Sequence, residues 1–237
     1  MYCGESVVVG MPAYNESANI ATAVTSFLNQ EWVDDVVVVD NNSTDGTAKL
    51  AEEAGAVVIR EPNQGYGYAC RRALAEANEQ GDLLVLVEPD GTFAARDIEK
   101  LLAYSNDFDF VVGTRTAREL IWEGANMDPF LRWGNWFVGK ILEVLHNTSS
   151  LTDVGCTFRL ISSDAYEDIR DELTVGGSHF SPEMLVRVAS SDTSMIEIPV
   201  NYRPREGTSK ITGEFLPAFK LGLVMIVFIV KEWVNRK

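Results

Sequence analysis

The chain has 237 residues and is 46% apolar, which is enough for a large hydrophobic core and excludes an intrinsically disordered protein. Its 35 acidic and 20 basic residues give a formal charge of −15, which argues against a nucleic-acid-binding protein, because such proteins carry a basic face toward phosphates. The three cysteines are far apart in sequence, so neither a disulfide framework nor a structural zinc site is expected.

Short apolar strands alternate with helical stretches through the first half of the chain. Strands are expected at about 7–9, 36–39, 56–59, 83–87 and 108–112. The spacing predicts helices at about 18–29, 47–54, 69–80 and 95–104, with a flexible loop over 63–68. This alternation is typical of an α/β fold built on a single mostly parallel sheet flanked by helices, in which ligands bind at the carboxyl ends of the strands.

The second half is less regular. Aromatic and aliphatic residues recur at helical spacing from Pro129 to His146, which predicts an amphipathic helix. A loop entering a strand is expected at 153–160, a helix at 181–189 and a strand at 195–200. The loop over 202–210 then carries three positive charges within eight residues, which is unusual in so acidic a chain.

Two carboxylates follow the most apolar of the predicted strands. Glu88 and Asp90 flank Pro89, and because strand side chains alternate, both carboxylates point to the same side. Such a pair suits Mg²⁺ or Mn²⁺, which prefers oxygen ligands and keeps positions open for a substrate diphosphate. The alternative is a surface turn at Asp90 beside a solvated Glu88. Asp40 follows another buried strand and is a candidate to bind a base or ribose.

Several motifs occur in one order along nearly the whole chain. Residues 9–16 (VGMPAYNE), 39–47 (VDNNSTDGT) and 88–91 (EPDG) resemble those of family 2 glycosyltransferases, which have the GT-A fold. Within that family, residues 112–115, 153–159, 180–184 and 205–210 are most similar to dolichyl-phosphate mannose and glucose synthases.

The resemblance implies roles for individual residues. It places a nucleotide sugar, of the UDP-glucose or GDP-mannose type, against Pro12, Tyr14, Asn15, Glu16 and Asp40. It places the metal, Mg²⁺ or Mn²⁺, at Glu88 and Asp90, although the family usually has aspartate at the first of these two positions. Catalytic groups would be Asp90 together with four cations, of which Arg205 and Lys210 face the donor diphosphate and Arg115 and Arg132 the acceptor phosphate. Two alternatives to these roles remain. Arg132 would lie on the solvent-facing side of its helix, and the loop at 205–210 would be a solvated charged loop without contact to the donor.

The implied reaction is an inverting, metal-dependent transfer of a hexose to a polyprenyl or dolichyl phosphate. A lipid phosphate is already anionic, so no separate general base is required. Two alternatives remain, namely an enzyme of the same family that extends a glycan or cell-surface polymer, and a catalytically silent sugar-nucleotide-binding subunit. A nucleotidyltransferase is disfavoured because the chain lacks a glycine-rich N-terminal loop.

The C-terminal segment is a candidate for contact with a membrane. We expect a GT-A domain at 1–212 and a C-terminal apolar helix at 213–237. The uncharged run from Leu221 to Val230 is shorter than the roughly 20 residues of a bilayer span. It could form a buried core helix, an interfacial helix or the start of a membrane segment, and Trp233 beside basic residues slightly favours an interface. The expected location is the cytoplasmic face of the cell membrane, with the chain peripheral or anchored through this segment.

Two expectations concern the surroundings of the protein. The first residues lack the features of a signal peptide, so no export signal is expected and the cysteines would remain reduced. The excess of carboxylates leads to the hypothesis of a high-salt habitat, in which abundant ions screen self-repulsion.

Overall fold

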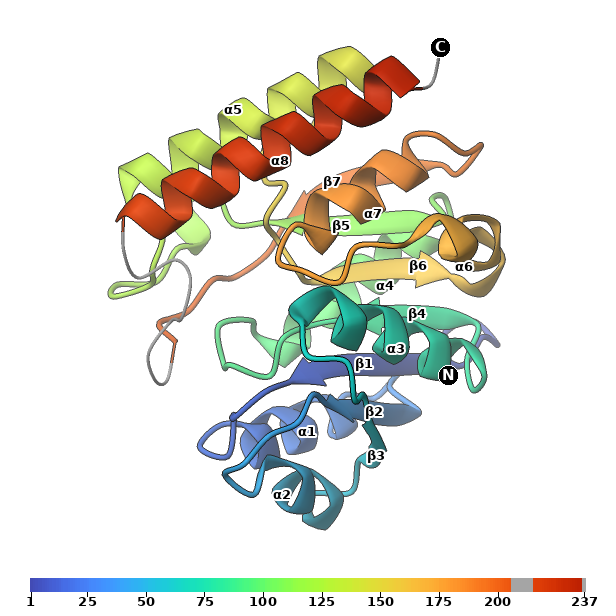
Figure 1. Ribbon diagram of the computed structural model, residues 1–237. Helices are drawn as coiled ribbons and strands as arrows, with labels where there is room; N and C mark the ends of the chain where they lie inside the picture. Colours follow the sequence, from blue (N-terminus) through green and yellow to red (C-terminus); the bar gives the residue numbers. More distant parts are fainter. Residues whose placement is uncertain (206–214, 236–237) are drawn as a thin grey trace.

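The computed structural model of the chain describes residues 1–205 and 215–235. It contains one seven-stranded sheet with the strand order β3-β2-β1-β4-β6-β5-β7 (Figure 1). The strands are β1 Val7–Ala13, β2 Asp35–Asp40, β3 Val57–Arg60, β4 Leu83–Leu86, β5 Phe110–Thr114, β6 Arg159–Ser162 and β7 Met195–Pro199. Only β6 among them is antiparallel to its neighbours β4 and β5, so the predicted mostly parallel sheet is confirmed.

Helices cover both faces of the sheet. They are α1 Ile20–Leu28, α2 Thr47–Glu53, α3 Tyr66–Asn78, α4 Ile98–Ser105, α5 Pro129–His146, α6 Ser163–Ile169, α7 Phe180–Val188 and α8 Phe215–Asn235, with short 3₁₀ turns at Ala95–Asp97, Arg118–Leu120 and Arg170–Glu172. Alternating strand residues point to opposite faces. In β1, Val8 packs into the core beneath α3 and α5–α8, whereas Val7 and Val9 pack into the core beneath α1, α2 and α4.

The segment predicted as a flexible loop at 63–68 is more ordered than expected. Helix α3 begins at Tyr66, and the amide of Gly67 donates to the carbonyl of Gly176, 3.0 Å away. A Cβ atom on Gly65 would lie 2.3 Å from that same carbonyl oxygen. Glycine is therefore required for close backbone contact here, and the contact fixes the start of the helix.

Helices α5 and α8 lie side by side above one end of the sheet, as the yellow-green and red helices of Figure 1 show. Met225 and Ile229 of α8 are buried, and the imidazole Nε2 of His146 lies 3.2 Å from the carbonyl oxygen of Ile229. Val227 and Val234 are 66% and 54% exposed, so α8 packs one apolar side into the core and leaves a second apolar side exposed. Within residues 1–205 and 215–235, no helix has the length and hydropathy needed to cross a membrane. The predicted domain boundary at 212 lies outside the described residues.

Candidate functional site

A cavity of about 600 Å³ opens at the carboxyl ends of β1, β4 and β5, where sheets of this kind bind ligands. Seven of the predicted site residues line it: Pro12, Tyr14, Glu16, Glu88, Asp90, Arg115 and Arg205. The described structure therefore brings together side chains separated by nearly 200 positions in sequence. Lys210 lies outside the described residues.

Asn15 and Asp40 lie beside the cavity and hold the loops that form its rim. Asn15 has a left-handed backbone (φ 55°), a conformation that asparagine tolerates, and its Oδ1 accepts from the amide of Thr44 at 2.8 Å. Asp40 is buried at the end of β2, and its Oδ1 accepts from the amide of Ser43 at 3.2 Å. The Asn15 contact joins the loops after β1 and β2, and the Asp40 contact fixes the start of the loop after β2.

The turn after β4 holds Asp90 firmly. Its Oδ1 accepts from both the amide and the hydroxyl of Thr92, at 3.0 and 2.6 Å, and the side chain is almost fully buried. Its Oδ2 lies 3.3 Å from Nη1 of Arg205. Nη2 of the same arginine donates to Oε1 of Glu16 at 2.5 Å. Arg205 thereby connects the loop after β1 with the turn after β4.

Glu88 lines the same wall of the cavity as Asp90. Burial and the neighbouring Asp90 carboxylate raise the pKa of Glu88 from 4.5 to about 7. A cation placed between two such carboxylates would relieve their repulsion, so the donor set suits a hard divalent ion. Among the described residues there is no cluster of three or more His, Cys, Asp or Glu side chains able to hold a metal. A metal held by Glu88 and Asp90 would therefore take its remaining ligands from substrate and water.

Arg115 is held in place by an ion pair with a buried carboxylate, which we call the clamp. Its Nε and Nη2 donate to the two oxygens of Asp153 at 2.8 and 2.9 Å, and its guanidinium lies 5.2 Å from the ring centre of Tyr202. Burial alone would lower the pKa of Arg115, but Asp153 raises it well above its ordinary value. The clamp uses two of the five N–H donors of a guanidinium that lines the cavity and stays protonated.

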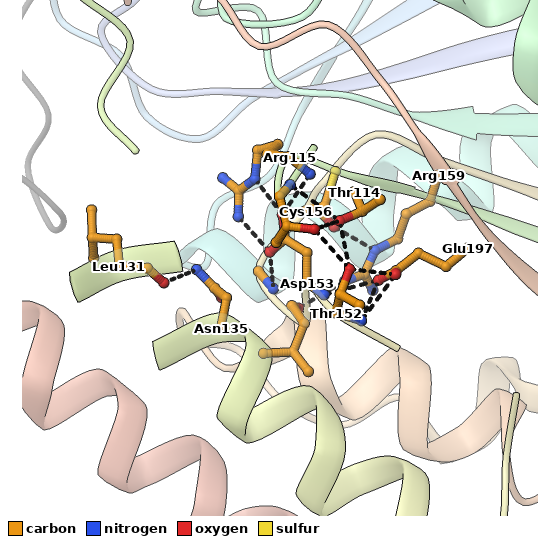
Figure 2. Close-up of polar contacts among 12 residues, drawn as sticks. Thr114, Arg115, Leu131, Asn135, Thr152, Asp153, Cys156, Arg159 and Glu197 are labelled. Carbon is orange, nitrogen blue, oxygen red and sulfur yellow. Dashed lines mark hydrogen bonds and ion pairs between the residues drawn. The ribbon is translucent and has the colours of Figure 1, made fainter. Parts of the chain in front are cut away.

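The clamp is held in turn by a second polar layer. The amide of Asp153 donates to Glu197 of β7 at 2.8 Å, and Thr152 donates to the same carboxylate through its amide and its hydroxyl. Figure 2 shows this chain of contacts running from Arg115 to Glu197. Asp153 and Glu197 position Arg115 and do not line the cavity themselves. The sequence offered a signal for Asp153, which lies in the 153–159 motif, and none for Glu197.

Helix α5 lines the cavity with a side that does not include Arg132, the residue that the family resemblance placed at the acceptor phosphate. Leu131, Gly134, Asn135 and Val138 line the cavity, whereas Arg132 is not among the lining residues. Asn135 Oδ1 and Arg115 Nη2 would each lie 2.9 Å from a Cβ atom on Gly155, so this glycine lets both groups approach the same point. Sequence reasoning missed Asn135, because nothing in a helical pattern says which polar residue the neighbouring elements will cover.

Arg159 supports the floor of the cavity. It is 1% exposed, and it donates to the carbonyl oxygens of Val154, Cys156 and Ser181 at 3.1, 2.8 and 2.8 Å. Burial lowers its pKa. These bonds tie the turn after Asp153 to the start of α7, and both segments contribute lining residues.

Known proteins with similar sequences include two from one organism. The chain is 32% identical over 209 residues to the low-salt glycan biosynthesis hexosyltransferase Agl6 of Haloferax volcanii, covering 86% of this chain but only 49% of that longer protein. It is 29% identical to the dolichyl-phosphate hexose transferase of the same organism, covering 89% of this chain and 88% of the relative.

A similar fold occurs in a solved structure. Glucosyl-3-phosphoglycerate synthase from Mycobacterium tuberculosis, in complex with Mn²⁺ and UDP-glucose, superposes with a TM-score of 0.68 over 98% of this chain and 79% of that one. The sequence identity is 17%, so this likeness bears on the fold alone. Residues 8–170 match the family model described as Glycosyl transferase family 2. Because that match spans more than half of the sequence, the chain belongs to glycosyl transferase family 2.

Proposed function

We propose that this glycosyltransferase moves a hexose from a nucleotide sugar to a polyprenyl or dolichyl phosphate, with inversion and with the help of Mg²⁺ or Mn²⁺. The observation that carries the proposal is the two-sided character of the cavity. One side is charged, with Glu16, Asp90, Arg115 and Arg205. The other is apolar and is built from α5 and α8, with Phe130, Phe137, Leu223, Met225 and Ile226. A substrate with a phosphate head and a hydrocarbon tail matches both sides.

The residues support a direct displacement. A phosphate oxygen of the acceptor would attack the anomeric carbon while the bond from that carbon to the nucleotide diphosphate breaks, and the nucleoside diphosphate would leave with the electron pair. Arg115 would bind and orient the acceptor phosphate, since a guanidinium grips phosphate through paired N–H groups. Arg205 would stabilise the leaving diphosphate. A metal bound at Glu88 and Asp90 would neutralise further negative charge on that group.

The relatives support the same substrate class. One relative that covers most of this chain is named as a dolichyl-phosphate hexose transferase. The names of the relatives leave open which sugar and which nucleotide this chain uses.

The apolar surface of α5 and α8 supports a location at the membrane surface. Exposed residues of α5 follow helical spacing at Phe130, Trp133, Phe137 and Val144, and those of α8 do so at Phe219, Leu223, Val227, Val230 and Val234. We name these nine residues the apolar helix face. Phe130, Phe137, Phe219 and Leu223 also line the cavity, so the apolar helix face shares residues with the apolar side of the cavity and would lead a lipid tail toward the site.

Transfer assays test the proposal. Purified protein would be incubated with Mn²⁺, polyprenyl phosphate and radiolabelled UDP-glucose, GDP-mannose or related donors, with Asp90→Ala as the control. We expect labelled lipid from one donor with the wild type and at least a hundredfold less with the variant, as expected when a metal ligand is lost. Absence of labelled lipid with every donor would overturn the proposal. Equal background turnover in both proteins would favour a silent binding subunit.

A glycan-extending enzyme is the second candidate, and one observation favours it. A hydroxyl acceptor needs a general base, and Glu88, which lines the cavity and whose pKa burial and Asp90 raise to about 7 in the metal-free protein, would suit that task where it does not hold the metal. Replacing the lipid phosphate by oligosaccharides in the same assay separates the two functions, because only one of the two acceptors should be labelled.

A further inference from the structure

Arg205 lies between two carboxylates that the proposed donor site needs. Its guanidinium is 2.5 Å from Glu16 and 3.3 Å from Asp90, and the three side chains are 24%, 13% and 5% exposed. Pairs this well buried are screened little by salt. The contacts therefore fix Arg205 at the mouth of the site.

Both oxygens of Asp90 are already engaged. Oδ1 accepts two hydrogen bonds from Thr92, so Oδ2 is the oxygen best placed to bind a metal, and it faces Arg205. A divalent cation at Oδ2 would lie against the positive guanidinium, and the two would repel each other. Metal binding at Asp90 and the Arg205 contact are therefore opposed.

We propose that Arg205 and the divalent metal compete for Asp90, and that the nucleotide diphosphate resolves this competition by drawing the guanidinium onto its own oxygens. The inference rests on the proposed function. A diphosphate carries at least two negative charges and accepts paired N–H groups, so it can replace both carboxylates as partner of Arg205. Metal and nucleotide then bind as a unit, and metal alone binds weakly.

Two further features favour this exchange. Nε of Arg205 is buried and has no hydrogen-bond partner among the described residues, so the present arrangement leaves one donor unsatisfied. Glu88 and Asp90 alone offer few ligands, so a metal there depends on oxygens that a diphosphate would bring.

A titration of the protein with Mn²⁺, followed by electron paramagnetic resonance of the free ion, tests the inference in the absence of nucleotide. Arg205→Met should bind Mn²⁺ about tenfold more tightly than the wild type, the size of a typical coupling between sites. Arg203→Met is the matched control. Arg203 stacks on Trp122 at 4.8 Å and does not line the cavity, so its loss changes the net charge equally and should leave Mn²⁺ affinity unchanged.

Adding UDP distinguishes failure of the inference from failure of the proposed function. UDP should raise the Mn²⁺ affinity of the wild type at least tenfold and that of Arg205→Met much less. If Arg205→Met binds Mn²⁺ no more tightly than the wild type while UDP still promotes binding, competition is wrong and the donor site stands. If neither protein binds Mn²⁺ with UDP present, the proposed donor site itself is wrong.

Thermal melting checks that the variants fold. If Arg205→Met unfolds, Arg205→Gln, which keeps a hydrogen-bond donor, replaces it. In the absence of nucleotide, Mn²⁺ should raise the melting temperature of the Arg205 variant more than that of the wild type, because a ligand stabilises the state that it binds. An equal rise in both proteins would overturn the competition.

Discussion

Glu88 and Asp90 are separated only by Pro89, yet their surroundings differ. Asp90 is held by Thr92 and Arg205, whereas Glu88 is buried beside a like charge that raises its pKa to about 7. The strand pattern and spacing predicted that both point to the same side, and both line the cavity. The proton affinity of Glu88 could not be predicted, because it depends on charges that distant parts of the chain bring to the cavity.

The raised pKa of Glu88 predicts a pH-dependent stability. Glu88 binds a proton near pH 4.5 when unfolded and near pH 7 when folded, so the folded state holds the extra proton between these values. The free energy of unfolding of the metal-free protein should therefore fall as pH rises from about 5 to 8, by at most roughly 3 kcal/mol. Glu88→Gln should remove this contribution. Urea unfolding curves in chelator measure both proteins, and identical pH dependence would contradict the prediction.

Asp153→Asn should affect both stability and acceptor binding. The substitution removes the charge that pairs with Arg115 and leaves a buried guanidinium uncompensated, which should lower the free energy of unfolding by about 3 kcal/mol. Arg115 should also lose its orientation, so the KM for the acceptor should rise while the KM for the donor changes little. Denaturant unfolding and steady-state kinetics measure these effects.

Glu167→Gln provides the control for Asp153→Asn. Glu167 pairs with Arg170 at a surface where both side chains are more than 40% exposed. Its loss should change the free energy of unfolding by less than about 1 kcal/mol. A similarly small change for Asp153→Asn would show that the ion pair between Asp153 and Arg115 contributes little to the free energy of unfolding.

At the scale of elements, the sequence predicted helix α5 well but not its orientation. Its apolar spacing indicated an amphipathic helix over the observed residues, 129–146. Which side faces the cavity is decided by α8, which packs against it, and by Gly155, which admits Asn135. For the same reason Arg132 was named and Asn135 was missed. The antiparallel direction of β6 likewise depends on pairing with β4 and β5, which local pattern does not encode.

The apolar helix face predicts membrane binding through α5 and α8. Val227→Asp places a charge on its most exposed position in α8, 66% exposed, and should weaken binding to phospholipid vesicles at least fivefold, because a carboxylate resists transfer toward hydrocarbon. Stability should change by less than about 0.5 kcal/mol, since the site is exposed. Vesicle co-sedimentation measures the binding.

Val57→Asp is the matched control for this experiment. Val57 is 41% exposed in β3, on the edge of the sheet and far from α5 and α8 in Figure 1. It should leave vesicle binding unchanged. Equal loss in both variants would indicate a general effect of negative charge, and no loss in either would exclude α8 from membrane contact.

At the scale of the whole molecule, charge is unevenly arranged. The chain carries a formal charge of −15, yet two arginines, Arg115 and Arg205, face the cavity. Anionic substrates would therefore approach these two arginines through a negative surrounding field, and salt should weaken that field. The hypothesis of a high-salt habitat follows from the composition.

The charge of −15 predicts that salt stabilises the fold by screening self-repulsion. The Debye length falls from about 10 Å at 0.1 M to about 3 Å at 1 M, so most of the gain in unfolding free energy should be complete by about 1 M KCl. Reversing three exposed glutamates, Glu31, Glu52 and Glu79, to lysine changes the formal charge from −15 to −9, since each reversal adds two, and should flatten the dependence. Urea unfolding at 0.1 and 2 M KCl measures both proteins. Equal stability of the wild type at both concentrations would refute the hypothesis, and an equal gain in both proteins would assign it to salt effects on apolar surface instead.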